Sequence, residues 1–133
     1  MINQITVFLE NKGGRLASLC RSLADAGVNM EALTIADTAD YGIARIVCDK
    51  PEEALKALEE AGYRAKITKV VGVELPNRPG SLAELLEFVD EKNLNVEYGY
   101  CFSNATDTAT QVMKLRDIEN AAVMLKAAGF DVI

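Results

Sequence analysis

The segment Pro76-Asn-Arg-Pro-Gly-Ser-Leu82 has a counterpart sixty-six residues earlier, Glu10-Asn-Lys-Gly-Gly-Arg-Leu16. The match extends beyond these loops, because Val28-Asn-Met-Glu31 corresponds to Leu94-Asn-Val-Glu97. A repeat of this length indicates two copies of one folding unit rather than a short-period solenoid. Both copies keep a glycine loop just before a helical pattern, a place where small anions are often held.

Each copy has the pattern of a strand, a helix, two strands, a helix and a last strand. Apolar residues first alternate, at Ile5, Val7 and Leu9, and then recur at helical spacing, at Leu16 and Leu19. This β-α-β-β-α-β order is the ferredoxin-like pattern. We therefore expect an α+β fold of two ferredoxin-like βαββαβ repeats, with antiparallel sheets side by side and the helices on one face.

The two copies follow one another without a linker. Residues 64–75 contain no cluster of Pro, Ser or Gly, so the last strand of copy one runs into the first strand of copy two. We place the first repeat at residues 1–69 and the second at residues 70–133. Two such small units should stabilise each other, because about 65 residues are marginal for an independent core.

Charge and composition exclude several classes of function. The chain has 133 residues and a net charge of −6, which argues against binding to nucleic acid or to an anionic membrane surface. It contains no histidine, so the commonest general base and metal ligand are missing, and we expect no catalytic residue, metal or cofactor. Three widely spaced cysteines favour reduced core thiols, and no signal peptide or membrane span is evident, so we expect a cytoplasmic protein.

Gly80 and Gly14 lie where each loop becomes a helix. The first N–H groups of a helix have no partner within it, and the helix dipole favours negative charge there, so a carboxylate would be well held. The alternative is a tight turn between strand and helix with no ligand.

Asn29 and Asn95 occupy equivalent positions at the start of the second strand of each copy. An asparagine amide donates and accepts at once, which suits the backbone of an amino acid. The alternative is turn chemistry, because asparagine tolerates a left-handed backbone.

The run of an apolar strand, Asn77-Arg-Pro-Gly-Ser-Leu82, an amphipathic helix and Leu94-Asn-Val96 resembles the ACT domain, and the whole chain resembles a tandem ACT protein. ACT domains are small-molecule regulatory modules that most often bind amino acids between paired domains. The resemblance places one site at Asn11–Leu16 with Asn29 and the other at Asn77–Leu82 with Asn95. If the copies pair side by side, the loop of one copy faces the second strand of the other, so we expect the Gly80 loop to act with Asn29 and the Gly14 loop with Asn95. Copy one departs from the pattern at Gly13, which stands where copy two has Pro79. The implied ligand-binding residues are Asn11, Lys12, Gly13, Gly14, Arg15, Leu16, Asn29, Asn77, Arg78, Pro79, Gly80, Ser81, Leu82 and Asn95.

The sequence thus favours a regulatory protein over an enzyme. We expect it to bind an amino acid or a related small carboxylate and to act on a separate enzyme of amino-acid metabolism. Strand alternation places Phe8, Ile43, Val47 and Met113 on the sheet face away from the helices, and such a face, if uncovered, suggests a homodimer. The alternatives are a small metabolic enzyme and a structural interaction module with no ligand.

Overall fold

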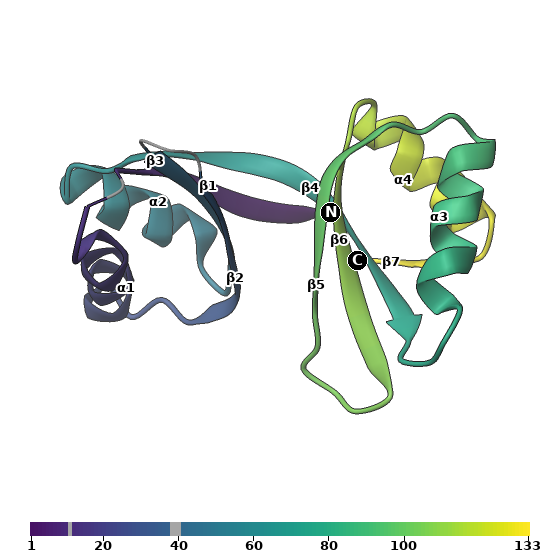
Figure 1. The fold of residues 1–133 in the computed structure, drawn as a ribbon, viewed down its shortest axis with the longest axis horizontal. Coiled ribbons are helices and arrows are strands. Elements are labelled where there is room, and N and C mark those ends of the chain that lie inside the picture. Colours follow the sequence, from purple (N-terminus) through teal and green to yellow (C-terminus); the bar gives the residue numbers. More distant parts are fainter. Residues whose placement is uncertain (11, 38–40) are drawn as a thin grey trace. The chain divides into compact units, whose positions relative to one another are not determined.

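The chain folds into an α+β structure, seen in a computed structural model that describes residues 1–10, 12–37 and 41–133 (Figure 1). Within those residues, two compact units are formed by residues 3–68, here called the first repeat, and by residues 69–133 with 1–2, here called the second repeat. The elements in order are β1 (Ile2–Glu10), α1 (Arg15–Asp25), β2 (Met30–Asp37), β3 (Tyr41–Cys48), α2 (Pro51–Glu60), β4 (Arg64–Pro76), α3 (Ser81–Glu91), β5 (Val96–Phe102), β6 (Thr108–Leu115), α4 (Ile118–Ala127) and β7 (Asp131–Val132).

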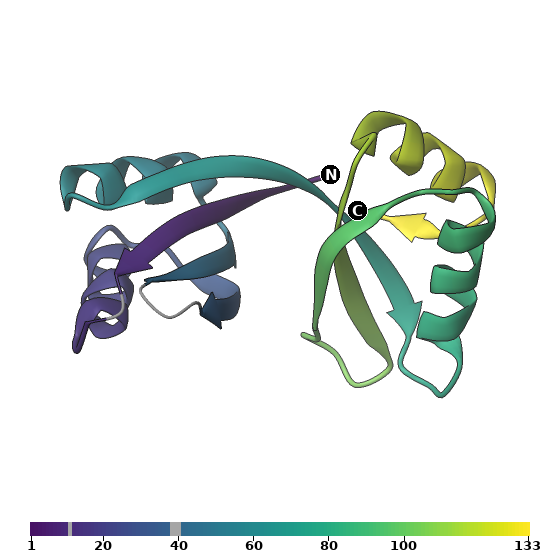
Figure 2. The ribbon, with the colours of Figure 1, turned by 45° about the horizontal axis from the view of Figure 1, so that its top comes forward.

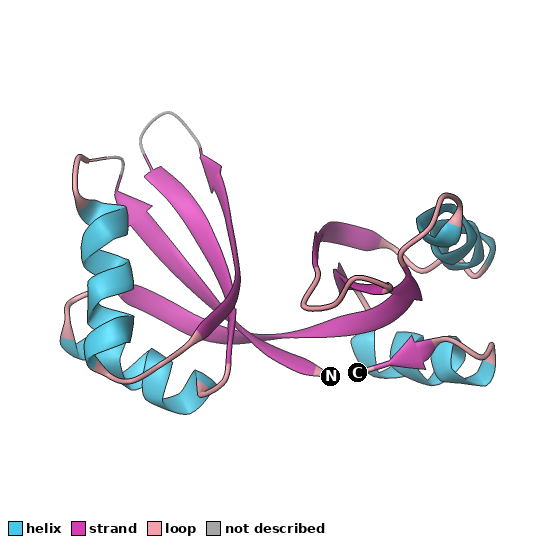
Figure 3. Cartoon of the chain, turned by 90° about the horizontal axis from the view of Figure 1, so that it is seen from below, coloured by secondary structure: helices cyan, strands magenta, loops and turns pink. Residues whose placement is uncertain are grey.

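The first repeat is an antiparallel sheet with the strand order β2-β3-β1-β4. Ile5 of β1 lies opposite Ile46 of β3, which places both side chains on the same face of the sheet. Helices α1 and α2 cover that face (Figure 3). The buried core beneath them is apolar, as the alternating pattern of β1 predicts, and consists of Ile5, Val7, Leu9, Leu19, Leu23, Val28, Ala44, Ile46, Ala54, Leu58 and Tyr63.

The second repeat has the same order, β5-β6-β4, with β7 on the other side of β4. Val71 lies opposite Met113 in β6, and Val73 lies opposite Val132 in β7. Helices α3 and α4 flank this sheet (Figure 2). The core is built from Val71, Val73, Leu75, Leu85, Val89, Met113, Leu115, Ala121, Ala122 and Leu125. The predicted ferredoxin-like fold is therefore confirmed in both repeats.

The two repeats are joined directly by β4, a single strand of 13 residues, as the absence of a linker sequence predicts. Its first part, Arg64 to Thr68, belongs to the first repeat, and the rest belongs to the second repeat. The first two residues of the chain also belong to the second repeat, where Ile2 lies against Gly72. None of the described helices has the length and apolar character that a membrane crossing requires.

Two expectations about side chains are wrong. Met113 belongs to the core under α3 and α4, because its register opposite Val71 turns it toward the helices. Phe8 and Ile43, by contrast, lie opposite each other on the face away from the core. Cys101 is exposed rather than a core thiol, because it lies on β5, an outer strand of its sheet.

Candidate functional site

The two glycine loops share two backbone hydrogen bonds. In the first loop the N–H of Lys12 donates to the carbonyl of Glu10 at 2.8 Å, and the N–H of Arg15 donates to that of Lys12 at 3.4 Å. In the second loop the equivalent bonds, from residues 78 and 81, are 2.9 and 3.4 Å long. Both loops are thus built alike, although their side chains differ.

A glycine ends each loop because the backbone is left-handed there. Gly14 has a φ of 83° and Gly80 a φ of 94°, and each residue is the N-cap of the helix that follows. Among the described residues, no side chain caps either helix, so the first-turn N–H groups have no side-chain acceptor there. Both glycines therefore lie where the loop becomes a helix, as predicted. The start of each helix suits an anionic group.

Lys12 is exposed and forms an ion pair with Glu10 at 2.9 Å. The hydrogen bond and the charge of Lys12 hold the pKa of Glu10 below its usual value. Glu10 therefore stays ionised at neutral pH and offsets the charge of Lys12. Asn11, another predicted site residue, lies outside the described residues.

Arg15 begins α1 and is the best-held cation of the first loop. Its guanidinium carbon lies 4.6 Å from the centroid of the Tyr63 ring, and the Tyr63 hydroxyl donates to the Arg15 carbonyl at 3.3 Å. The Nε of Arg15 is buried and has no hydrogen-bond partner within the part of the chain that the structure describes. A buried N–H donor without a partner lowers the stability of the fold, so this Nε is a position where a ligand could supply the acceptor.

The second loop uses two of its predicted site residues for structure. The Asn77 side chain donates to the carbonyl of Thr106 at 3.1 Å, and its backbone N–H donates to the carbonyl of Asp107 at 2.8 Å. Asn77 thus ties the loop to the β5–β6 hairpin. Arg78 is exposed and lies 3.5 Å from the carboxylate of Glu84, in the first turn of α3.

Ser81 is the most confined polar residue of the second loop. Only 4% of it is exposed, and its Oγ has no hydrogen-bond partner. It is the first residue of α3, directly after Gly80. The next residue, Leu82, is 45% exposed, as is its counterpart Leu16 at 39%, so each loop is bordered by an accessible apolar side chain.

Asn29 and Asn95 are exposed and are separated from the loop of their own repeat by a helix. Helix α1 has 11 residues, and at 1.5 Å per residue it is about 16 Å long. A small ligand cannot bridge that distance. The two asparagines therefore do not join the loop of the same repeat.

The left-handed turn does not explain these two asparagines. Asn93, the only described non-glycine residue with a positive φ, has a φ of 55°. Asn29 and Asn95 instead accept a backbone hydrogen bond, from Asp49 at 3.2 Å and from Arg116 at 3.3 Å. Their backbone carbonyls therefore have a structural role. A turn conformation does not account for the choice of asparagine side chains at these two positions.

Among the described residues, two cavities border the first loop, and Arg15 lines both. The smaller, of about 150 Å³, includes Lys12, Leu16 and Ile35. The larger, of about 480 Å³, is lined by Phe8, Glu10, Arg15, Tyr41, Tyr63 and Arg64, among others. Sequence reasoning missed Tyr41, Tyr63 and Arg64. The signal that could have found Arg64 is that the second repeat has an acidic residue, Asp131, at the equivalent position.

The family model for an ACT domain pair matches residues 1–128. The chain belongs to the ACT domain pair family. A protein of known structure from Bacteroides thetaiotaomicron is 37% identical, with a TM-score of 0.94 over 99% of this chain and 91% of that one. Among curated proteins, none matches this ACT pair significantly.

The regulatory subunits of aspartate kinase share the fold of this ACT pair. The subunit from Thermus thermophilus, in its ligand-free form, is 19% identical, with a TM-score of 0.72 over 96% of this chain and 90% of that one. The subunit from Thermus flavus is 20% identical, with a TM-score of 0.64 over 96% of this chain and 91% of that one. Within the described residues, no group of three or more His, Cys, Asp or Glu residues could hold a metal ion.

Proposed function

We propose that this ACT pair is a regulatory protein that binds an amino acid or a related small carboxylate at its glycine loops. The observation that carries the proposal is the pair of matching backbone hydrogen bonds in the two loops, each of which ends in a left-handed glycine before a helix without a side-chain cap among the described residues. The surrounding side chains differ between the repeats, while the backbone cradle is the same. A duplicated cradle of this kind suits a carboxylate.

The ligand carboxylate accepts hydrogen bonds from the first-turn N–H groups of α1 or α3. The Ser81 hydroxyl, buried without a partner, gains one in the second site. An asparagine from another ACT repeat completes each site: Asn95 acts with the Gly14 loop, and Asn29 acts with the Gly80 loop. Its amide oxygen accepts from the ligand ammonium group, and its amide nitrogen donates to the carboxylate.

Regulation of a separate enzyme is the output that we favour. The aspartate kinase subunits with this fold are named as regulatory subunits. We propose that this chain forms a homodimer and acts on an enzyme of amino-acid metabolism, with no catalysis of its own.

A thermal-shift screen against the twenty amino acids and related carboxylates tests the proposal. A ligand at 100 times its dissociation constant adds about 2.7 kcal/mol of stability. Asn29→Ala and Asn95→Ala should each reduce the shift and leave the melting temperature of the free protein unchanged, because both side chains are exposed. Asn104→Ala, an exposed asparagine in the β5–β6 hairpin, is the matched control. An unchanged shift in the Asn29→Ala, Asn95→Ala double variant would rule out these sites.

These asparagine variants are sharper than a change at Gly80. A valine there would fill the space at the start of α3. The φ of 94° makes any side chain at that position strained, so Gly80→Val would also disturb the loop itself.

A further inference from the structure

The larger cavity beside the first loop has features that the glycine loops do not explain. It has a volume of about 480 Å³, within the range of small-molecule sites, which is roughly 300–1,000 Å³. It runs from Arg15, at the start of α1, to Arg64, at the start of β4. All of its lining residues belong to the first repeat.

Two guanidinium groups of this cavity are placed by aromatic rings. Arg15 lies over Tyr63, and the guanidinium carbon of Arg64 lies 5.8 Å from the centroid of the Phe8 ring. Phe8 in turn contacts Tyr41, with ring centroids 6.2 Å apart. An arginine stacked on a ring keeps the edge of its planar fork available for a carboxylate.

Neither arginine forms an ion pair within the described part of the chain, where the ion pairs involve other residues. The charge of Arg15 also helps to lower the pKa of Glu10, after the larger effects of Lys12. The carboxylate of Glu10 borders the cavity but is already paired with Lys12. The cavity is therefore a positively charged place on a chain whose net charge is −6.

The second repeat shows that the fold alone does not create this charge. At the positions of Arg15 and Arg64 it has Ser81 and Asp131, and at the position of Phe8 it has Glu74. Glu74 and Asp131 lie directly opposite each other on β4 and β7. The same place in the fold is thus cationic and aromatic in one repeat and acidic in the other.

We propose that this cavity binds a second ligand, a small organic anion that carries a carboxylate on an aromatic body. Arg15 and Arg64 hold the carboxylate by charge-assisted hydrogen bonds. The exposed rings of Phe8 and Tyr41, 43% and 47% accessible, supply an apolar surface for the ring of the ligand. The cavity would give the first repeat a second input, separate from the amino-acid sites.

The probe is 3-phenylpropionate, and the neutral control is 3-phenylpropanamide, which has the same shape without the charge. Isothermal titration on the full chain should show saturable binding of the acid and at least about tenfold weaker binding of the amide. Arg64→Gln should weaken binding of the acid by about tenfold or more, because it removes one guanidinium. Arg21→Gln, an exposed arginine on α1 with the same change of charge, should leave the affinity unchanged.

Amide resonances locate the bound probe. In NMR titrations the largest shifts should fall on Gly62, Tyr63 and Arg64. Equal binding of acid and amide, wild-type affinity in Arg64→Gln, or no saturation at about 1 mM probe would each overturn the proposal.

Failure of this second site can be distinguished from failure of the proposed amino-acid sites. The two sites share Arg15, so the test rests on Arg64, which lies outside the glycine loop. Arg64→Gln should keep any thermal shift by amino acids, and Asn29→Ala with Asn95→Ala should keep binding of 3-phenylpropionate. Loss of phenylpropionate binding in the asparagine double variant, with wild-type affinity in Arg64→Gln, would assign the probe to the glycine loops and refute the second site.

Discussion

The Tyr63 ring lies against the Arg15 guanidinium carbon at 4.6 Å, and its hydroxyl donates to the Arg15 carbonyl at 3.3 Å. The same side chain thus holds both the charge and the backbone of the first residue of α1. It does so from the turn between α2 and β4, 48 residues away along the chain. Tyr63 is 5% exposed and belongs to the apolar core, so the start of the glycine-loop helix is anchored directly to that core.

Two substitutions of Tyr63 should separate packing from hydrogen bonding. Tyr63→Phe keeps the ring under Arg15 and loses one hydrogen bond, which should lower the free energy of unfolding by about 0.5–1.5 kcal/mol. Tyr63→Ala empties the core position and should cost about 3–5 kcal/mol. Urea denaturation measures both. Equal losses in the two variants would contradict the role given to the ring.

Gly13→Pro should stabilise the first loop. The two loops share their backbone hydrogen bonds, and the second carries Pro79 at the equivalent position, so the backbone of the first loop should accept a proline. A compatible proline adds about 0.4–1 kcal/mol by restricting the unfolded chain. Gly14→Pro is the control: the φ of 83° is incompatible with proline, and this variant should be destabilised. Chemical denaturation of both variants checks the prediction, which fails if Gly13→Pro is less stable than the wild-type protein.

Asp131→Asn should make the second repeat more stable. Glu74 and Asp131 are cross-strand partners of like charge, an arrangement that destabilises a sheet. Removing one charge should raise the free energy of unfolding by about 0.2–1 kcal/mol. The gain should shrink at high salt, because Asp131 is exposed and its charge is screened. A gain that is the same in 10 mM and in 1 M salt, about 30 and 3 Å of screening length, would argue against a charge effect.

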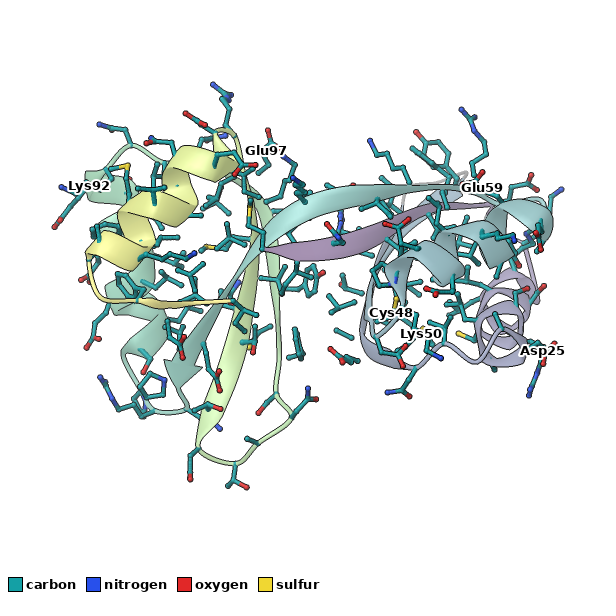
Figure 4. All side chains as sticks on the ribbon, turned by 180° about the vertical axis from the view of Figure 1, so that it is seen from behind. Asp25, Cys48, Lys50, Glu59, Lys92 and Glu97 are labelled. Carbon is teal, nitrogen blue, oxygen red and sulfur yellow. The ribbon has the colours of Figure 1, made fainter. Side chains whose placement is uncertain are left out.

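Cys48 and Cys101 should differ in reactivity toward iodoacetamide. Cys101 is exposed, whereas Cys48 is half-buried at the end of β3, near Lys50 (Figure 4). Burial raises the pKa of the Cys48 thiol, and the carboxylates of Asp49, Glu31 and Glu53 add to this, against a backbone hydrogen bond from Lys50 that lowers it.

At pH 8 the thiolate fraction of Cys48 is therefore small, and Cys101 should be alkylated first. Raising the pH should speed the alkylation of Cys48, because its thiolate then becomes populated. Mass spectrometry over time gives the rate at each cysteine. Faster labelling of Cys48 than of Cys101 at pH 8 would contradict both the burial and the direction of the pKa shift.

The repeat itself made the fold predictable. Apolar alternation in β1 and the helical stripe of α1 depend on local periodicity, so they could be read without tertiary contacts. The third strands, Tyr41–Cys48 and Thr108–Leu115, contain β-branched and aromatic residues, which favour strands. Met113 was misplaced because a register shift of one residue exchanges the two faces of a strand, and register is set by the partner strand.

The sites were less predictable, because side-chain roles depend on distant neighbours. The glycines at 14 and 80 could be placed, since a left-handed backbone before a helix is a local requirement. Asn77 was assigned to ligand binding, but its side-chain amide donates a hydrogen bond to the carbonyl of Thr106, 29 residues away.

By itself, the sequence determined the family, the two βαββαβ repeats and the position of both glycine loops, because these follow from repetition and short-range periodicity. Only the tertiary structure decided which side chains meet at each loop. Arg15 and Tyr63 are far apart in the chain, and so are Phe8 and Arg64. Their contacts arise because β1 and β4 are neighbours in the sheet of the first repeat, with α1 packed beside them. That arrangement forms the cationic cavity, which no local sequence pattern predicts.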